Sequence, residues 1–149
     1  MRQFLTTSRN AVASLLCLCS QSSSAQEWSI VFDCGSSSGY RVDAKDGSFS
    51  KDGMSSGRFQ LVRRGNDYDL RIVDGVQRMF SAREDGASVV GRETGDGSLQ
   101  VIAYYPLPNV ESYLFSRSQD GKARFVSAST KDLGFARGGT LFTGECTHR

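Results

Sequence analysis

The chain has 149 residues, a length typical of one domain and too short for a multidomain enzyme. Its 18 basic residues exceed its 16 acidic ones by two, and Arg2 and Arg9 both lie in residues 1–25, which contain no acid. Residues 26–149 are therefore formally neutral. Because nucleic acids and anionic membrane surfaces are bound by clustered Lys and Arg in excess, we expect no nucleic-acid partner.

Residues 1–25 have the three parts of a secretory signal peptide. A basic start is followed by the apolar run 11–19 and by Ser23 and Ala25, small residues directly before Gln26. The run is shorter than the ~20 apolar residues of a membrane-spanning helix, so we expect no stable membrane insertion. The sequence predicts cleavage after residue 25 and a periplasmic or secreted protein.

Cleavage would reduce the four cysteines to two. Cys17 and Cys19 leave with the leader, and each follows a leucine, whereas a lipoprotein signal has a small residue before the lipidated cysteine. The remaining pair, Cys34 and Cys146, predicts a disulfide in an exported protein. A zinc site is the poorer alternative, because only His148 accompanies the pair and structural zinc takes four ligands. We therefore expect no metal and no cofactor.

Turns and short apolar runs alternate through the rest of the chain. All 16 glycines lie beyond residue 25, and many stand in Asp-Gly pairs, which suit the positive φ of tight hairpin turns. The runs between them alternate with the period of two that is typical of strands. The predicted strands cover residues 28–33, 39–44, 57–64, 67–74, 77–83, 87–93, 98–105, 110–118 and 122–129, with a last one near 139–146. No segment predicts a long helix, and residues 130–137 allow one short helical turn.

One hairpin can be predicted pair by pair. A two-residue loop at 65–66 places Arg64 opposite Asp67 and sorts the apolar residues of both strands onto one face, which a one-residue slip would destroy. The next loop must be longer, because a two-residue turn there would set Arg71 against Arg78. The predicted apolar face comprises Phe59, Leu61, Leu70 and Ile72, together with Trp28, Ile30 and Phe32 of the first strand.

These elements predict one domain over residues 26–149, an all-β antiparallel meander of nine or ten short strands. Closure into a barrel would remove the two exposed sheet edges, and a disulfide between the first and last strands fits such closure. A two-sheet sandwich with the same disulfide is the alternative.

The catalytic inventory is thin. No free cysteine follows the leader, and His148 is the penultimate residue, where chain ends are usually mobile. Residues 36–38 are serines with no base nearby and are interpreted as a solvated turn, and 46–52 lacks the acid spacing of a calcium loop. A carboxylate pair remains open, since a glycosidase needs only two. We interpret the protein as not an enzyme, with a carboxylate-dependent hydrolase as an alternative.

Two connections are candidates for binding. The first, residues 45–57, is rich in Gly and Ser and exposes Phe49 and Met54; loops on a rigid scaffold often carry recognition. The second begins with Tyr104 and Tyr105 and holds both prolines of the chain, so its aromatic residues are low-entropy anchors. These four side chains are the predicted binding residues.

A family resemblance rests on three features: a cysteine in the first strand, the tripeptide Ser38-Gly39-Tyr40 after it, and a cysteine in the last strand. In these the chain resembles the periplasmic inhibitors of C-type lysozymes. The resemblance implies a small exported β-barrel that binds a lysozyme, and no site residue is carried over from it.

Together these observations predict an exported, non-enzymatic binding protein of the bacterial cell envelope, whose loops hold a protein or a small apolar ligand. A lysozyme-inhibitor-like protein, a hydrolase and a structural envelope protein are the alternatives. The sequence does not specify an oligomeric state.

Overall fold

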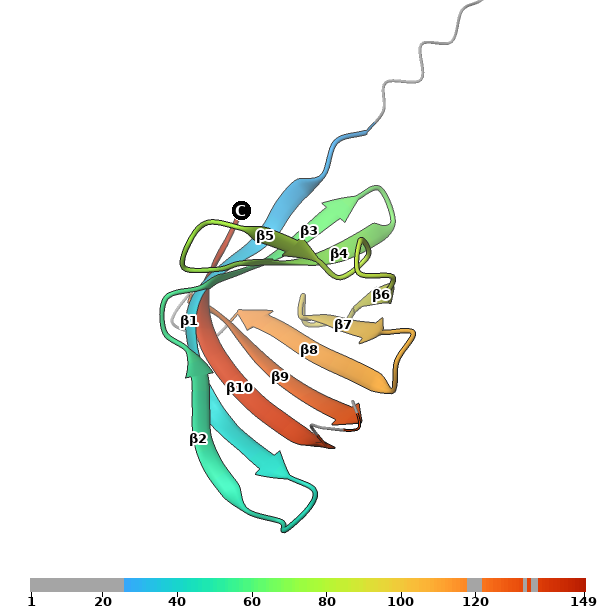
Figure 1. Cartoon of the computed structure of the whole chain (residues 1–149). Coiled ribbons are helices and arrows are strands. Elements are labelled where there is room, and N and C mark those ends of the chain that lie inside the picture. The colour runs from blue at the N-terminus through green and yellow to red at the C-terminus, as the bar shows by residue number, and fades with distance from the viewer. Residues whose placement is uncertain (1–25, 118–121, 133, 135–136) are drawn as a thin grey trace, which may run out of the picture.

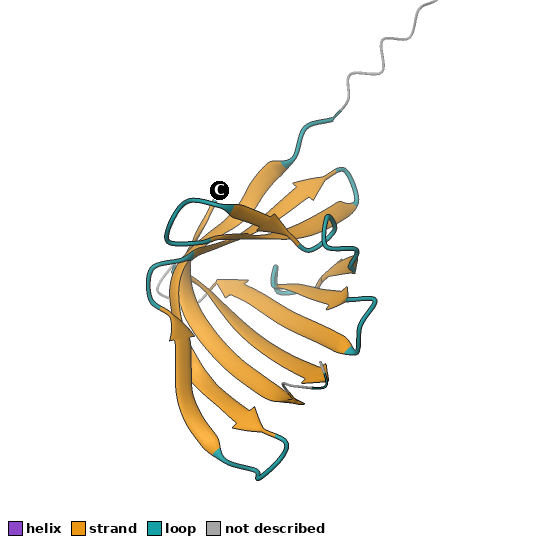
Figure 2. Ribbon diagram, viewed as in Figure 1, coloured by secondary structure: helices purple, strands orange, loops and turns teal. Residues whose placement is uncertain are grey.

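The computed structural model describes residues 26–117, 122–132, 134 and 137–149. Every regular element within these ranges is a strand (Figure 2). No helix long and apolar enough to cross a membrane occurs among the described residues. The predicted signal peptide, and the Asp-Gly turn at 120–121, lie outside these ranges.

All ten strands belong to one antiparallel sheet, which confirms the all-β meander. In chain order they are β1 (Ser29–Asp43), β2 (Phe49–Met54), β3 (Arg58–Arg64), β4 (Asp67–Val73), β5 (Met79–Ser81), β6 (Ser88–Glu93), β7 (Leu99–Tyr104), β8 (Asn109–Arg117), β9 (Ala123–Asp132) and β10 (Arg137–His148). The sheet order is β5-β4-β3-β1-β10-β9-β8-β7-β6, with β2 also paired to β1. Figure 1 shows a single, strongly curled sheet rather than two stacked ones. Among the described residues, no backbone ladder joins the edge strands β5 and β6.

Strand β1 is the longest of the sheet and replaces two predicted strands. On one side it pairs with β10 from Phe32 to Asp43. On the other side its first half pairs with β3 and its second half with β2, and the change falls between Cys34 and Ser37. The β1–β2 hairpin therefore lies at the end of the sheet away from β3 and β4 (Figure 1).

The predicted β3–β4 register is confirmed. Arg64 lies opposite Asp67, and Phe59 and Leu61 face Ile72 and Leu70, whereas Val62 lies opposite Asp69 on the other face of the sheet. Phe59, Leu61 and Leu70 are buried in the core, so the sorting of the two faces decides the register. The following turn is the longer loop expected, with Val73 paired to Met79.

A β-bulge changes the faces of the first strand. Ile30 pairs with Val62, whereas Phe32 pairs with Leu61, so Ile30 and Phe32 lie on opposite faces of the sheet. Phe32 enters the core as predicted. The placement of Ile30 on the same face was wrong, because the bulge adds a residue that strict alternation does not anticipate.

Trp28 also leaves the predicted apolar face. Its ring lies 4.5 Å from the guanidinium carbon of Arg64 and 5.6 Å from that of Arg71, two residues on the outer face. The indole therefore makes cation–π contacts on the convex side instead of joining the core.

The segment 45–57, predicted to be a loop, contains strand β2. The strand pairs residue by residue with the second half of β1 across a tight turn, in which the amide of Gly47 donates to the carbonyl of Asp43 at 2.9 Å. Asp52 and Gly53 disfavour a strand by propensity, so the pairing with the long β1 decides the outcome.

Two further boundaries differ from the prediction. Strand β5 has three residues, because the amide of Arg83 donates to the carboxylate of Asp69 at 3.2 Å instead of extending the ladder. The helical turn allowed at 130–137 is absent over its described residues, since β9 continues to Asp132. The carboxylate of Asp132 accepts hydrogen bonds from the amide of Gly134 at 3.2 Å and from Nε of Arg137 at 2.8 Å, and these bonds stabilise the β9–β10 hairpin.

Aromatic rings fill the concave side. Phe32 stacks on Phe115 at 5.0 Å between centroids, and Phe59 stacks on Tyr113 at 4.9 Å. Several rings lie directly over glycines: a Cβ on Gly144 would come within 2.7 Å of the ring of Phe125, its cross-strand partner. Cβ atoms on Gly39 and Gly91 would meet the rings of Phe142 and Tyr68 in the same way. Glycines opposite aromatic residues let the sheet curl tightly while its inner face stays filled.

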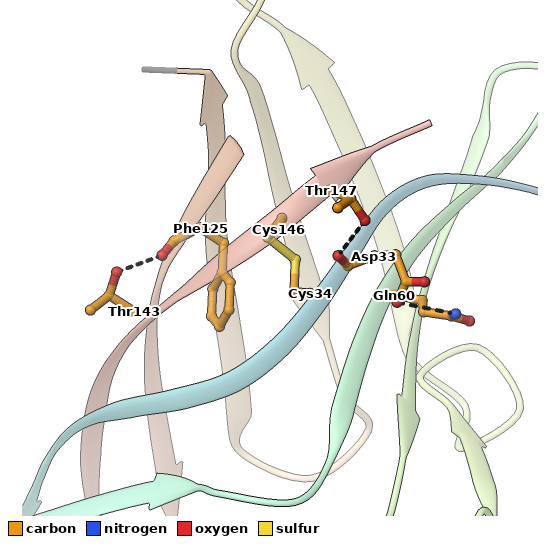
Figure 3. The surroundings of a disulfide bond; sticks show 7 residues. All are labelled: Asp33, Cys34, Gln60, Phe125, Thr143, Cys146 and Thr147. Atoms are coloured by element: carbon orange, nitrogen blue, oxygen red, sulfur yellow. Dashed lines mark hydrogen bonds between the residues drawn. A yellow bond between two sulfur atoms is a disulfide. The ribbon is translucent and has the colours of Figure 1, made fainter. Parts of the chain in front are cut away.

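The predicted disulfide is present and joins directly paired residues of the first and last strands (Figure 3). Cys34 is buried in the core. The hydroxyl of Thr147 donates to the carbonyl of Asp33 at 3.2 Å, and that of Thr143 donates to the carbonyl of Phe125 at 2.9 Å, so hydrogen bonds hold β10 on both sides of the bond.

We expect the Cys34→Ala/Cys146→Ala variant to lose on the order of 4–5 kcal/mol of unfolding free energy, because the bond closes a long loop in the unfolded chain. The two cysteines are 112 positions apart. Denaturant unfolding measures the loss, and the intact mass of the wild-type protein, which should rise by about 2 daltons on reduction, controls for the bond. A double variant as stable as the wild type would contradict this prediction.

Candidate ligand-binding cleft

A cleft of about 340 Å³ opens on the concave side of the sheet. Most of its lining comes from β2, the second half of β1, β10, β9 and β8, and β3 and β4 add one residue each. The apolar side chains that line it are Met54, Phe59, Ile72, Tyr113, Phe125 and Phe142. The charged side chains that line it are Arg41, Asp52, Glu111, Lys131 and Arg137.

Polarity rises along each wall strand towards one end of the sheet. On β9 the inward positions after Ala123 are Phe125, Ser127, Ser129 and Lys131. Each of them has one paired residue on β8 and one on β10, and the three residues form a row across the sheet. The row through Ser127 joins aromatic residues on both neighbours, whereas the row through Ser129 joins Thr140 and Glu111. The cleft therefore has an aromatic floor and a polar mouth.

Glu111 is the central polar group of the cleft. Its side chain is buried, with the residue 8% exposed, yet all its partners are polar. The hydroxyl of Tyr113 donates to Oε2 at 2.8 Å and that of Tyr105 at 3.3 Å, while Nζ of Lys131 lies 3.3 Å from Oε1. Both oxygens are occupied, which offsets the cost of burying the charge.

Burial and the adjacent carboxylate change the titration of the two phenols. Burial raises the pKa of Tyr113 well above its usual value, and the negative charge of Glu111 adds to the shift. Burial and Glu111 likewise raise the pKa of Tyr105. Both hydroxyls therefore remain protonated donors at neutral pH.

The cations at the mouth differ in their partners. Lys131 is paired with Glu111, and Nε of Arg137 lies 2.8 Å from the carboxylate of Asp132. Arg41 has no ion-pair partner within 4.0 Å among the residues that the structure describes.

The four predicted binding residues do not form one group. Met54 lines the cleft, and Tyr105 is half-buried behind it through its bond to Glu111. Phe49 is 75% exposed and Tyr104 is 49% exposed. The pairing register places both of these on the convex face, on strands that are not neighbours.

Sequence reasoning missed most of the cleft. The inward residues of β9 and β10 lie in predicted strands, but Ser127, Ser129 and Thr140 resemble solvated positions until the pairing shows which way they face. The signal that was present is the alternation of β9, which continues beyond the expected strand end at residue 129 as far as Asp132.

No group of three or more His, Cys, Asp or Glu side chains suited to a metal ion occurs in the described part of the chain. Comparison with protein-family models finds no matching family, and comparisons with curated proteins and with solved structures find no significant match.

We expect the phenols of Tyr105 and Tyr113 to ionise later in the native protein than in the unfolded chain, where tyrosines ionise near pH 10. Above about pH 10 the unfolded state has lost protons that the native state keeps, so the free energy of unfolding falls as the pH rises through this window. Tyrosinate absorbance, followed with and without denaturant, measures the delay. Tyr113→Phe should remove part of the delayed absorbance, and coincident native and denatured titrations would contradict the buried contacts.

Proposed function

We propose that this chain is an exported, non-enzymatic binding protein of the bacterial cell envelope, which holds a small apolar ligand in its concave cleft. The observation that carries the proposal is the aromatic floor below a polar mouth. The volume of about 340 Å³ is within the usual range of small-molecule sites, roughly 300–1000 Å³. The ligand would then contact the sheet itself rather than the loops expected from the sequence.

The leader-like composition of residues 1–25 supports export. The Cys34–Cys146 bond supports it independently, because disulfides persist in oxidising compartments such as the periplasm and the cell exterior.

The partners of Glu111 support a non-enzymatic role. A carboxylate that transfers protons or attacks a substrate needs an oxygen free to reach it. Both oxygens of Glu111 are held by Tyr105, Tyr113 and Lys131. Asp52, the other carboxylate of the cleft, accepts the amide of Gly53 at 2.7 Å and has no base beside it among the described residues.

We also propose that the curled sheet is a closed barrel, in which side-chain contacts instead of backbone hydrogen bonds close the gap between β4 and β6. Arg83 supports this closure: its Nε donates to the carbonyl of Tyr68 at 2.6 Å and its Nη2 to that of Val89 at 3.0 Å. The ring of Tyr68 packs on Gly91, where a Cβ would come within 2.3 Å of it.

Gly91→Val tests the closure. The valine would displace Tyr68 from its place on β6, and we expect a loss of about 1–3 kcal/mol of unfolding free energy from overpacking. Gly95→Val is the matched control, since a Cβ on Gly95 meets nothing within 4 Å, and it should change stability by less than about 0.5 kcal/mol. Equal stabilities of the two variants would contradict a closed β4–β6 side.

The ligand site is tested with N-phenyl-1-naphthylamine, a neutral apolar probe that fluoresces when buried. We expect the wild-type protein to bind it and Met54→Ser, which removes an apolar wall of the cleft, to weaken binding several-fold. Phe49→Ser is the matched control: it lies on the same strand but on the convex face, and should leave the affinity unchanged.

Two outcomes would contradict the cleft as the ligand site. One is a wild-type protein that does not bind the probe. The other is a larger loss of affinity in Phe49→Ser than in Met54→Ser, which would instead favour recognition on the convex face, as expected for a protein partner such as a lysozyme.

A further inference from the structure

We infer that the ligand of the concave cleft is an amphipathic acid, whose anionic head pairs with Arg41 at the mouth while its apolar chain lies over the aromatic floor. The inference rests on the proposed function, since it names the chemical class of the molecule that the cleft would hold.

The position of Arg41 is defined by its neighbours on both sides. It lies opposite Ser50 on β2 and Thr140 on β10, and the same row continues to Ser129 and Glu111. One step deeper along the sheet, the row contains the aromatic residues Phe142 and Tyr113 together with the polar residues Asp52 and Ser127. A molecule with a polar head in the first row would therefore place its chain directly on the aromatic rings of the second.

Arg41 also differs from the other two cations of the cleft in charge balance. Lys131 and Arg137 each have a carboxylate within 3.3 Å. Among the described residues, no carboxylate lies within 4.0 Å of the Arg41 guanidinium and its side chain makes no hydrogen bond. A guanidinium has five donors arranged to bind a carboxylate in a bidentate way, so Arg41 is the cation available to an anionic ligand.

Hydroxyl groups beside Arg41 add donors for the same head group. Oγ of Ser129 and Oγ1 of Thr140 lie 2.6 Å apart and share one hydrogen bond. Because only one of the two hydroxyls donates in that bond, the other proton is free for an oxygen of the ligand.

Of the two carboxylates of the cleft, Glu111 is paired with Lys131, whereas Asp52 has no ion-pair partner among the described residues and opposes an anion at this place. Asp52 lies on β2 opposite Gly39, one row deeper than Arg41, and no ion pair joins the two among the described residues. Its charge should weaken the binding of an acid and leave a neutral chain unaffected. Arg41 and Asp52 therefore give opposite expectations for the same ligand.

The test compares decanoate, which is ionised at about pH 7.5, with decanol, which has the same chain length and no charge. Each displaces N-phenyl-1-naphthylamine from the cleft. We expect Arg41→Gln to raise the Kd of decanoate about five- to tenfold and to leave that of decanol unchanged. Asp52→Asn should lower the Kd of decanoate about two- to threefold, again without an effect on decanol.

Two further variants serve as controls. Arg41→Lys keeps the charge but not the fork, so we expect a smaller rise in the Kd of decanoate than in Arg41→Gln. Lys51→Gln removes a cation from the same hairpin, but it pairs with Tyr40 on the convex face and should change neither Kd.

The outcomes separate the inference from the proposed function. If decanol binds and Arg41→Gln leaves the Kd of decanoate unchanged, the anionic head is wrong and the apolar cleft stands. If neither decanol nor the naphthylamine binds the wild-type protein, the proposed function fails and the inference fails with it. A loss of both affinities in Arg41→Gln would show a structural role of this residue and would also overturn the inference.

Discussion

The antiparallel pairing of β1 with β10 is the interaction on which the rest of the sheet depends. It joins the start and the end of the described chain, and every other strand is added to one side of it or the other. The disulfide links the two strands at the point where the other neighbour of β1 changes from β3 to β2. The covalent bond thus holds the sheet where the apolar core ends and the cleft begins.

Curvature follows from this central pair. Gly39 on β1 and Gly144 on β10 each have an aromatic side chain of the neighbouring strand packed on them, so the inner face is dense even where the backbone bends. Beyond Phe142 the inward positions hold polar and charged side chains instead of aromatic rings. The cleft is therefore the unfilled end of the core, formed by the same alternation that fills the other end.

How much was predictable depends on how local the determining interactions are. The β3–β4 hairpin was predicted pair by pair, because its turn and its two-sided pattern lie within 16 residues, from Arg58 to Val73. The faces of Ile30 and Trp28 were not, since a bulge is set by the partner strand and leaves no mark in the pattern. Strand β2 was missed because its pairing with the long β1 overrides the weak propensity of its own residues.

The cleft was still less accessible to sequence reasoning, because its lining comes from seven strands whose neighbours are known only from the topology. Polar residues that point inward, such as Ser127 and Glu111, break the usual rule that the inner face is apolar. Departures of this kind are expected at functional sites.

The floor of the cleft shares residues with the core, so binding in the cleft would be linked to stability. Phe59, Tyr113 and Phe125 line the cleft and also belong to the buried cluster that holds the sheet together. A ligand on this floor would bind only the folded chain, and so would raise the free energy of unfolding in proportion to the logarithm of its concentration above Kd. Conversely, a substitution that loosens the floor weakens the fold and the site together. If the cleft holds a ligand as proposed, residues of the mouth, which the core does not use, are therefore where its preference could vary without loss of the fold.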